Sequence, residues 1–227
     1  APAVGDARVD VSRGGVGVAA EGLRRPDGEG AGVHGVGVEL DLGGVVADAE
    51  RRERPPREAL FERIGKEWGS LDILVHSIAW APKDDLQGGL LHCSADGFAK
   101  AMDVSCHSFV RMAKLAAPLM KDGGTMFAMS YHGAQKVVDN YNVMGPVKAA
   151  LEACCRYLSY ELGGQGIRVH AISPGPLKTR AASGLKDFEL LLNEAATRAP
   201  LGELVDVMDV GFTCAYLATP YARRITG

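Results

Sequence analysis

The stretch Leu71-Asp-Ile-Leu-Val-His-Ser-Ile78 decides the fold class. It is a short apolar run that follows a helical pattern ending at Gly69, and such a run is typical of a strand buried on both faces. Two similar runs occur at 125–130 and 167–173, and helical patterns separate them. Strands that alternate with helices predict a parallel sheet covered by helices on both faces. We therefore expect an α/β fold with a Rossmann-like, doubly wound parallel sheet.

Helical patterns surround these strands, at about residues 60–68, 94–117, 146–162, 186–196 and 206–218. We expect Ser94 to cap the second helix, because a serine hydroxyl accepts from the free N–H groups of a first turn. Pro146 is tolerated only in the first turn of a helix, since it lacks the donor that later turns need. The third helix is therefore expected to begin near Asn142, with Tyr141 at its edge and Lys148 about two turns in.

The composition excludes several classes of protein. The chain has 227 residues and a formal net charge of −3, so a basic surface for nucleic acid is not expected. No apolar stretch approaches the roughly 20 residues of a membrane span, and the first residues do not resemble a signal peptide. The five cysteines are odd in number and irregularly spaced, which favours neither disulfides nor a metal site. We expect a cytoplasmic protein that binds no metal, no membrane and no nucleic acid.

The beginning of the chain differs from the rest. Residues 1–60 use ten amino-acid types, and no aromatic residue appears before Phe61. Few large side chains and many glycines oppose the formation of a core. We therefore divide the chain into a low-complexity segment, 1–57, and a Rossmann-like folded domain, 58–227. Both a frame-shifted stretch and a genuine low-complexity region explain this composition. Within it, Gly30-Ala-Gly-Val-His-Gly35 matches G-x-G-x-x-G, but it lacks the strand before and the helix after that a dinucleotide-binding role requires.

The candidate site follows from the strand ends. Ligands of open parallel sheets bind beyond the carboxyl ends of the strands. Three of these ends carry small or hydroxylated residues and are expected to meet at one edge: His76-Ser-Ile-Ala79, Ser130-Tyr-His-Gly133 and Ser173-Pro-Gly-Pro176. Tyr141 and Lys148 are seven residues apart, so a helix would place them on one face. Such a pair can hold a proton and a cofactor hydroxyl, although an ordinary surface pair has the same spacing.

Three segments resemble bacterial NADH-dependent enoyl-[acyl-carrier-protein] reductase, a family of the short-chain dehydrogenase/reductase superfamily. They are Leu71–Lys83, Asn140–Glu152 and Ala171–Gly184, within a resemblance that covers about residues 58–227. The Y-x6-K motif of the family corresponds to Tyr141 and Lys148. Neither Tyr131 nor Tyr141 has a lysine four residues later, which argues against a general member with the Y-x3-K motif.

The resemblance implies reduction of a trans-2-enoyl thioester on acyl carrier protein, by hydride transfer from NADH to the β-carbon. Tyr141 would stabilise the enolate, Tyr131 would take part in proton delivery, and Lys148 would hold the nicotinamide ribose. Ala81 would lie near the substrate. The other cofactor-binding residues that the resemblance implies are Ser77, Ile78, Gly175, Leu177, Lys178, Thr179, Arg180 and Ala181. It also implies a homotetramer, with the two long helices at subunit contacts.

The sequence departs from the family at both ends. Residues 1–57 contain no match for the first strand and glycine-rich turn of the family, and its last strand would follow Gly227. We therefore expect the N-terminal strand–turn region and the last strand to be absent or degenerate. Two alternatives stay open. One is a non-enzymatic, truncated or frame-shifted remnant that binds no dinucleotide, and the other is a different short-chain carbonyl reductase.

Overall fold

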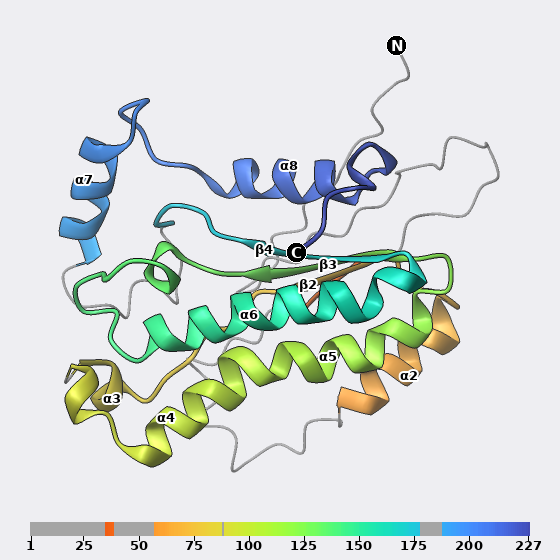
Figure 1. Cartoon of the computed structure of the whole chain (residues 1–227), viewed down its shortest axis with the longest axis horizontal. Helices are drawn as coiled ribbons and strands as arrows, with labels where there is room; N and C mark the ends of the chain where they lie inside the picture. Colours follow the sequence, from red (N-terminus) through yellow and green to blue (C-terminus); the bar gives the residue numbers. More distant parts are fainter. Residues whose placement is uncertain (1–34, 39–56, 88, 178–187) are drawn as a thin grey trace.

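The computed structural model describes residues 35–38, 57–87, 89–177 and 188–227. Its centre is a parallel sheet with the strand order β1-β2-β3-β4 (Figure 1). The strands are β1 (Gly35–Val38), β2 (Ile73–His76), β3 (Gly124–Met129) and β4 (Ile167–Ile172). The three strands that the apolar runs predict are therefore confirmed. Within the described ranges the spatial order follows the chain, so the reversal of order that marks a doubly wound sheet does not fall inside them.

Helices cover both faces of the sheet (Figure 1). One face carries α2 (Arg57–Glu67), α4 (Ala95–Met102), α5 (Ser108–Ala116) and α6 (Met144–Leu162), and the other carries α8 (Val207–Ala218). The predicted α/β class with a covered parallel sheet is therefore confirmed. The other elements described outside these layers are α3 (Lys83–Gln87), α7 (Phe188–Arg198), η1 (Leu90–His92), η3 (Ala117–Leu119), η4 (His132–Ala134), η5 (Gly163–Gln165) and η7 (Pro220–Ala222). In the described ranges, no helix combines the length and apolar character that crossing a membrane requires.

The hydrophobic core lies between the sheet and the α4–α6 layer. Leu74, Met126 and Val169 from three strands are fully buried, and they belong to one cluster with Phe109 of α5 and Leu151 of α6. Because both faces of these strands are covered, their sequences read as apolar runs rather than as alternating patterns.

One side chain joins α8 to the face of the sheet that it covers, on the other side from α4–α6. Arg168 of β4 donates from Nη2 to Thr125 Oγ1 at 2.7 Å and from Nη1 to the carbonyls of Leu217 and Ala222. Among the described residues, no side chain of α8 is buried, so the bonds to Leu217 in its last turn and to Ala222 just after it help to fix the helix.

The long helix predicted over residues 94–117 is interrupted. Ser94 caps α4 as expected, since its Oγ accepts from Gly97 N at 2.9 Å. The helix then passes through a π-helical turn, η2 (Asp103–His107), before it continues as α5. A π-turn contains one more residue per turn than an α-helix and frequently marks a functional site. Hydrophobic periodicity did not reveal this interruption.

Both ends of the described chain contact the edges of the central strands. β1 lies inside segment 1–57 and pairs in parallel with β2, so residues 35–38 add a strand that the composition of this segment did not indicate. Only Gly35 of the G-x-G-x-x-G match is described, and it begins a strand rather than following one. At the far edge, Gly227 N donates to Val169 O at 2.9 Å and Val169 N donates to Thr226 Oγ1 at 3.0 Å.

Candidate active site

The carboxyl ends of the strands meet at one edge of the sheet, as predicted. The parallel register pairs Val38 with His76, His76 with Ala128, and Met129 with Ile172. The next residues along the chain therefore emerge together. Ser77 and Ser173 are exposed there, and Tyr131 is half-buried. This edge is the candidate active site.

Two tyrosines form the centre of the site. Tyr131 follows β3 and Tyr141 precedes α6, and their rings contact edge to face with centroids 4.9 Å apart. Burial raises the pKa of both phenols above the ordinary value, and the nearby Tyr131 raises that of Tyr141 further. Both side chains are therefore protonated at neutral pH, and each can donate a hydrogen bond to a ligand oxygen.

The backbone around Tyr141 is held in an unusual conformation. Asn140 and Asn142, on either side of it, have φ values of 62° and 43°, in the left-handed region that asparagine tolerates better than most residues. Asn142 Nδ2 also donates to Leu86 O, which ties the tyrosine loop to α3. Gly133 packs on the Tyr141 ring so closely that a Cβ atom there would lie 2.8 Å from Cε1. The position of Tyr141 thus depends on three neighbours that the spacing of motifs did not reveal.

Lys148 lies on the buried face of α6, and its side chain reaches the end of β3. The residue is 4% exposed, and its Nζ donates to Met129 O at 2.6 Å. Burial lowers the pKa of this ammonium from 10.5 to about 8, and the charge of Glu152 is among those that oppose the shift. The helix start lies close to the prediction, because α6 begins at Met144 and Tyr141 precedes it. Lys148 lies about one turn into the helix rather than two, and it is buried rather than on the surface.

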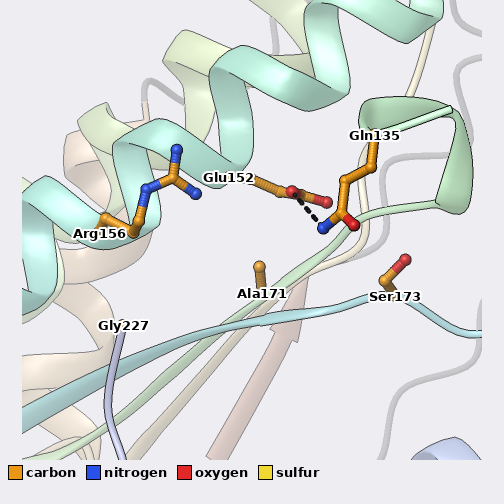
Figure 2. A pocket seen from close by; sticks show the side chains of 6 residues that line it. All are labelled: Gln135, Glu152, Arg156, Ala171, Ser173 and Gly227. Carbon is orange, nitrogen blue, oxygen red and sulfur yellow. Dashed lines mark hydrogen bonds between the residues drawn. The ribbon is translucent and has the colours of Figure 1, made fainter.

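A second polar group lies one helical turn further along α6. Glu152 is 9% exposed and accepts from Ser130 Oγ at 2.6 Å and from Gln135 Nε2 at 3.4 Å. It lines a cavity of about 190 Å³. Figure 2 shows it there with Arg156 from the same helix and Ser173 beyond the end of β4. The remaining lining residues are Gln135, Ala171 and Gly227. Sequence reasoning missed Glu152, although its spacing of four from Lys148 places both on one helix face.

The other predicted site residues fall into three groups. Ser77 and Gly175 are exposed, and Leu177 and Ala81 are half-buried. Ile78 is 1% exposed and belongs to the hydrophobic core, so its contact with a cofactor stays a prediction. The predicted residues Lys178, Thr179, Arg180 and Ala181 lie outside the described residues.

The described part of the chain contains no disulfide bond and no candidate metal site. All five cysteines are free, and Cys106 and Cys155 are buried as the sequence predicts for small core residues. The Sγ atoms of Cys106 and Cys154 are 3.8 Å apart, which brings η2 against α6. Within the described ranges, no three His, Cys, Asp or Glu side chains gather in a group that could hold a metal ion.

A parallel sheet with a tyrosine pair and a buried lysine at its carboxyl edge defines a Rossmann-like protein of the short-chain dehydrogenase/reductase superfamily. A family model described as "Enoyl-(Acyl carrier protein) reductase" matches residues 34–227. The chain belongs to this family. The match begins before residue 58 and includes β1, so the family resemblance extends further than the sequence motifs indicated.

Comparison with individual proteins supports the same assignment. The chain is 46% identical over 170 residues to "Enoyl-[acyl-carrier-protein] reductase [NADH] 1" of Rhizobium meliloti, covering 75% of this chain and 62% of that relative. The crystal structure of the Aquifex aeolicus NADH-dependent enoyl reductase is 44% identical, with a TM-score of 0.72, 74% of this chain covered and 66% of that one. The Anaplasma phagocytophilum enzyme, solved in complex with NAD, is 36% identical, with a TM-score of 0.73 and coverages of 85% and 78%. The chain thus spans less than two thirds of the length of the Rhizobium relative.

Proposed function

We propose that this chain catalyses the reduction of trans-2-enoyl thioesters in fatty-acid biosynthesis, with NADH as the reductant. Family membership supports the reaction class, and one observation in the site carries the proposal. Tyr141, a protonated phenol, and Lys148, a buried ammonium, both lie near the start of α6, at the carboxyl edge of the sheet. A phenol donor and a nearby positive charge are what a developing enolate oxygen requires.

Tyr141 would hydrogen-bond the thioester carbonyl oxygen. Its raised pKa keeps the proton on the phenol at neutral pH, so it can donate throughout the reaction. Tyr131, whose ring packs against it, would take part in delivering the proton to the α-carbon. Ala81, half-buried in the loop after β2, would face the acyl group.

Lys148 fits a role in holding a dinucleotide cofactor. An ammonium has three N–H donors, and among the described residues its one hydrogen-bond partner is Met129 O. The remaining donors can therefore bind the hydroxyls of the nicotinamide ribose. The bound NADH would supply the hydride that adds to the β-carbon. Ser77, Ile78, Gly175 and Leu177, together with residues 178–181, would complete the cofactor site.

The proposal includes the partners of the enzyme. The enoyl group would arrive on acyl carrier protein, and the reaction would take place in the cytoplasm. We also propose a homotetramer with subunit contacts along α4, α5 and α6. Tyr157 and Tyr160 on α6 are 72% and 89% exposed, and exposed aromatic side chains on one helix favour an interface.

The test measures cofactor binding and turnover separately. The full chain is titrated with NADH by nicotinamide fluorescence and then assayed with crotonyl and acetoacetyl thioesters. Saturable NADH binding and reduction of the crotonyl thioester alone are expected. Tyr141→Phe should lower kcat at least tenfold with little change in NADH affinity, whereas Tyr221→Phe, a matched change on an 86% exposed residue, should change neither.

The other outcomes separate the alternatives. Reduction of the acetoacetyl thioester but not of the crotonyl thioester would identify a carbonyl reductase. A folded sample that does not bind NADH would identify the non-enzymatic remnant.

A further inference from the structure

The π-turn η2 lies against the loop that forms one wall of the proposed site. This loop, residues 77–82, links β2 to α3 and contains Ser77, Ile78 and Ala81. It has no regular secondary structure of its own, so its conformation depends on contacts from elsewhere. Two contacts hold it: Ile78 is buried in the hydrophobic core, and Trp80 is hydrogen-bonded by a serine of η2.

Ser105 of η2 contacts the middle of the loop. Its side chain is fully buried, and its Oγ donates to Trp80 O at 2.8 Å while it accepts from Trp80 N at 2.7 Å. One hydroxyl therefore satisfies both backbone polar groups of a single loop residue. Among the described residues, Ser105 is the hydrogen-bond partner of the Trp80 backbone. A serine hydroxyl can serve in this way because it has one donor and two acceptor lone pairs.

Ser108, three residues later, is also buried, but it contacts strand β2 instead of the loop. It is 1% exposed, and its Oγ donates to Val104 O at 2.6 Å and lies 2.7 Å from His76 Nε2. Because this hydroxyl donates its proton to Val104, it accepts from His76, which is at the end of β2. Ser108 thus contacts the strand, and Ser105 contacts the loop beyond it.

We propose that Ser105 is a positioning residue for the active site, which holds the backbone of loop 77–82 through Trp80. The inference rests on the proposed function, because it assigns this loop to the wall of the cofactor and substrate site. Fixing Trp80 at both its N–H and its C=O restricts the residues that flank it, and Ala81 comes directly after it. Loss of the hydroxyl leaves both backbone groups without this partner and frees the loop.

The test uses Trp80 itself as the reporter. The chain has two tryptophans, so Trp68→Phe leaves Trp80 as the single emitter. In this background Ser105→Ala is compared with Ser108→Ala, which removes an equally buried hydroxyl that does not contact the loop. Acrylamide quenching without any ligand is expected to rise about twofold in Ser105→Ala and to stay unchanged in Ser108→Ala. Should Ser105→Ala not fold by circular dichroism, Ser105→Cys takes its place, since a thiol is a weaker hydrogen-bonding group of similar shape.

A second readout connects the loop with the reaction. Ser105→Ala is expected to raise the KM for a crotonyl thioester at least fivefold with a smaller change in kcat, whereas Ser108→Ala stays within twofold. Equal quenching in the two variants, or a KM unchanged in Ser105→Ala, would overturn the proposal. If the parent chain shows no turnover, the proposed function fails, and the ligand-free quenching comparison still decides whether Ser105 holds the loop.

Discussion

Gly133 offers the sharpest test of how the site holds its tyrosine. In Gly133→Ala, the new methyl group would lie 2.8 Å from Tyr141 Cε1 and closer still to Cδ1. Carbon atoms pack best at about 3.5–4.0 Å, so the ring would have to move by about 1 Å. Tyr141 is 9% exposed and has little room for such a movement.

The expected loss of activity follows from this displacement. A misplacement of about 1 Å at a reacting group can lower kcat/KM about 100-fold, or about 2.7 kcal/mol of transition-state stabilisation. Overpacking should also lower the free energy of unfolding by about 1–3 kcal/mol. The assay is steady-state reduction of a crotonyl thioester at saturating NADH, together with urea unfolding.

Gly163→Ala provides the matched control. Gly163 follows α6 with helical backbone angles, and a Cβ there would meet no atom within 4 Å. This variant should keep its activity within twofold. The reasoning is refuted if Gly133→Ala keeps full kcat/KM, or if Gly163→Ala loses as much activity.

Three further predictions concern the residues around the site. Lys148→Met should flatten the pH dependence of stability. The folded chain releases the Lys148 proton near pH 8, and the unfolded chain releases it near pH 10.5. The free energy of unfolding of the wild type should therefore rise with pH between these values, by about 3 kcal/mol relative to the variant. Urea unfolding at several pH values measures this, and parallel curves for the two chains would contradict it. Ser94→Ala should lower the free energy of unfolding by about 1 kcal/mol through loss of the α4 cap, whereas Ser159→Ala, a change near the end of α6, should have a smaller effect. Asn140→Val should cost about 1–2 kcal/mol because φ is 62°, and Asn140→Gly should be tolerated; equal thermal stabilities would rule out backbone strain as the cause.

The sequence predicted the framework of the molecule well, because buried parallel strands have a distinctive composition. The runs around Leu74 and Met126 are apolar on both faces, and the structure buries both residues completely. The helix repeat indicated that Tyr141 and Lys148 lie near the start of one helix, and the family resemblance supplied their roles. β1 was missed because a strand of glycine and valine, Gly35–Val38, does not stand out from a segment of the same composition.

The parts of the site that sequence reasoning missed depend on contacts distant in the chain. Glu152 reads as an ordinary helix-surface acid until Ser130 is seen to donate to it. Gly133 reads as a loop glycine until the Tyr141 ring is placed against it. A local pattern cannot predict such pairs, because folding, rather than spacing, brings the partners together.

The π-turn also has a consequence for insertions and deletions in the gene. An extra residue in an α-helix would rotate everything after it by about 100°. Here Ala101 before η2 and Phe109 after it are both fully buried, so the turn absorbs the added residue locally. Loss of one codon between positions 103 and 107 should therefore leave both core residues facing inward and redirect Ser105. A helix built in this way can gain or lose a polar contact by a single codon, without any change in the side chains that hold the fold together.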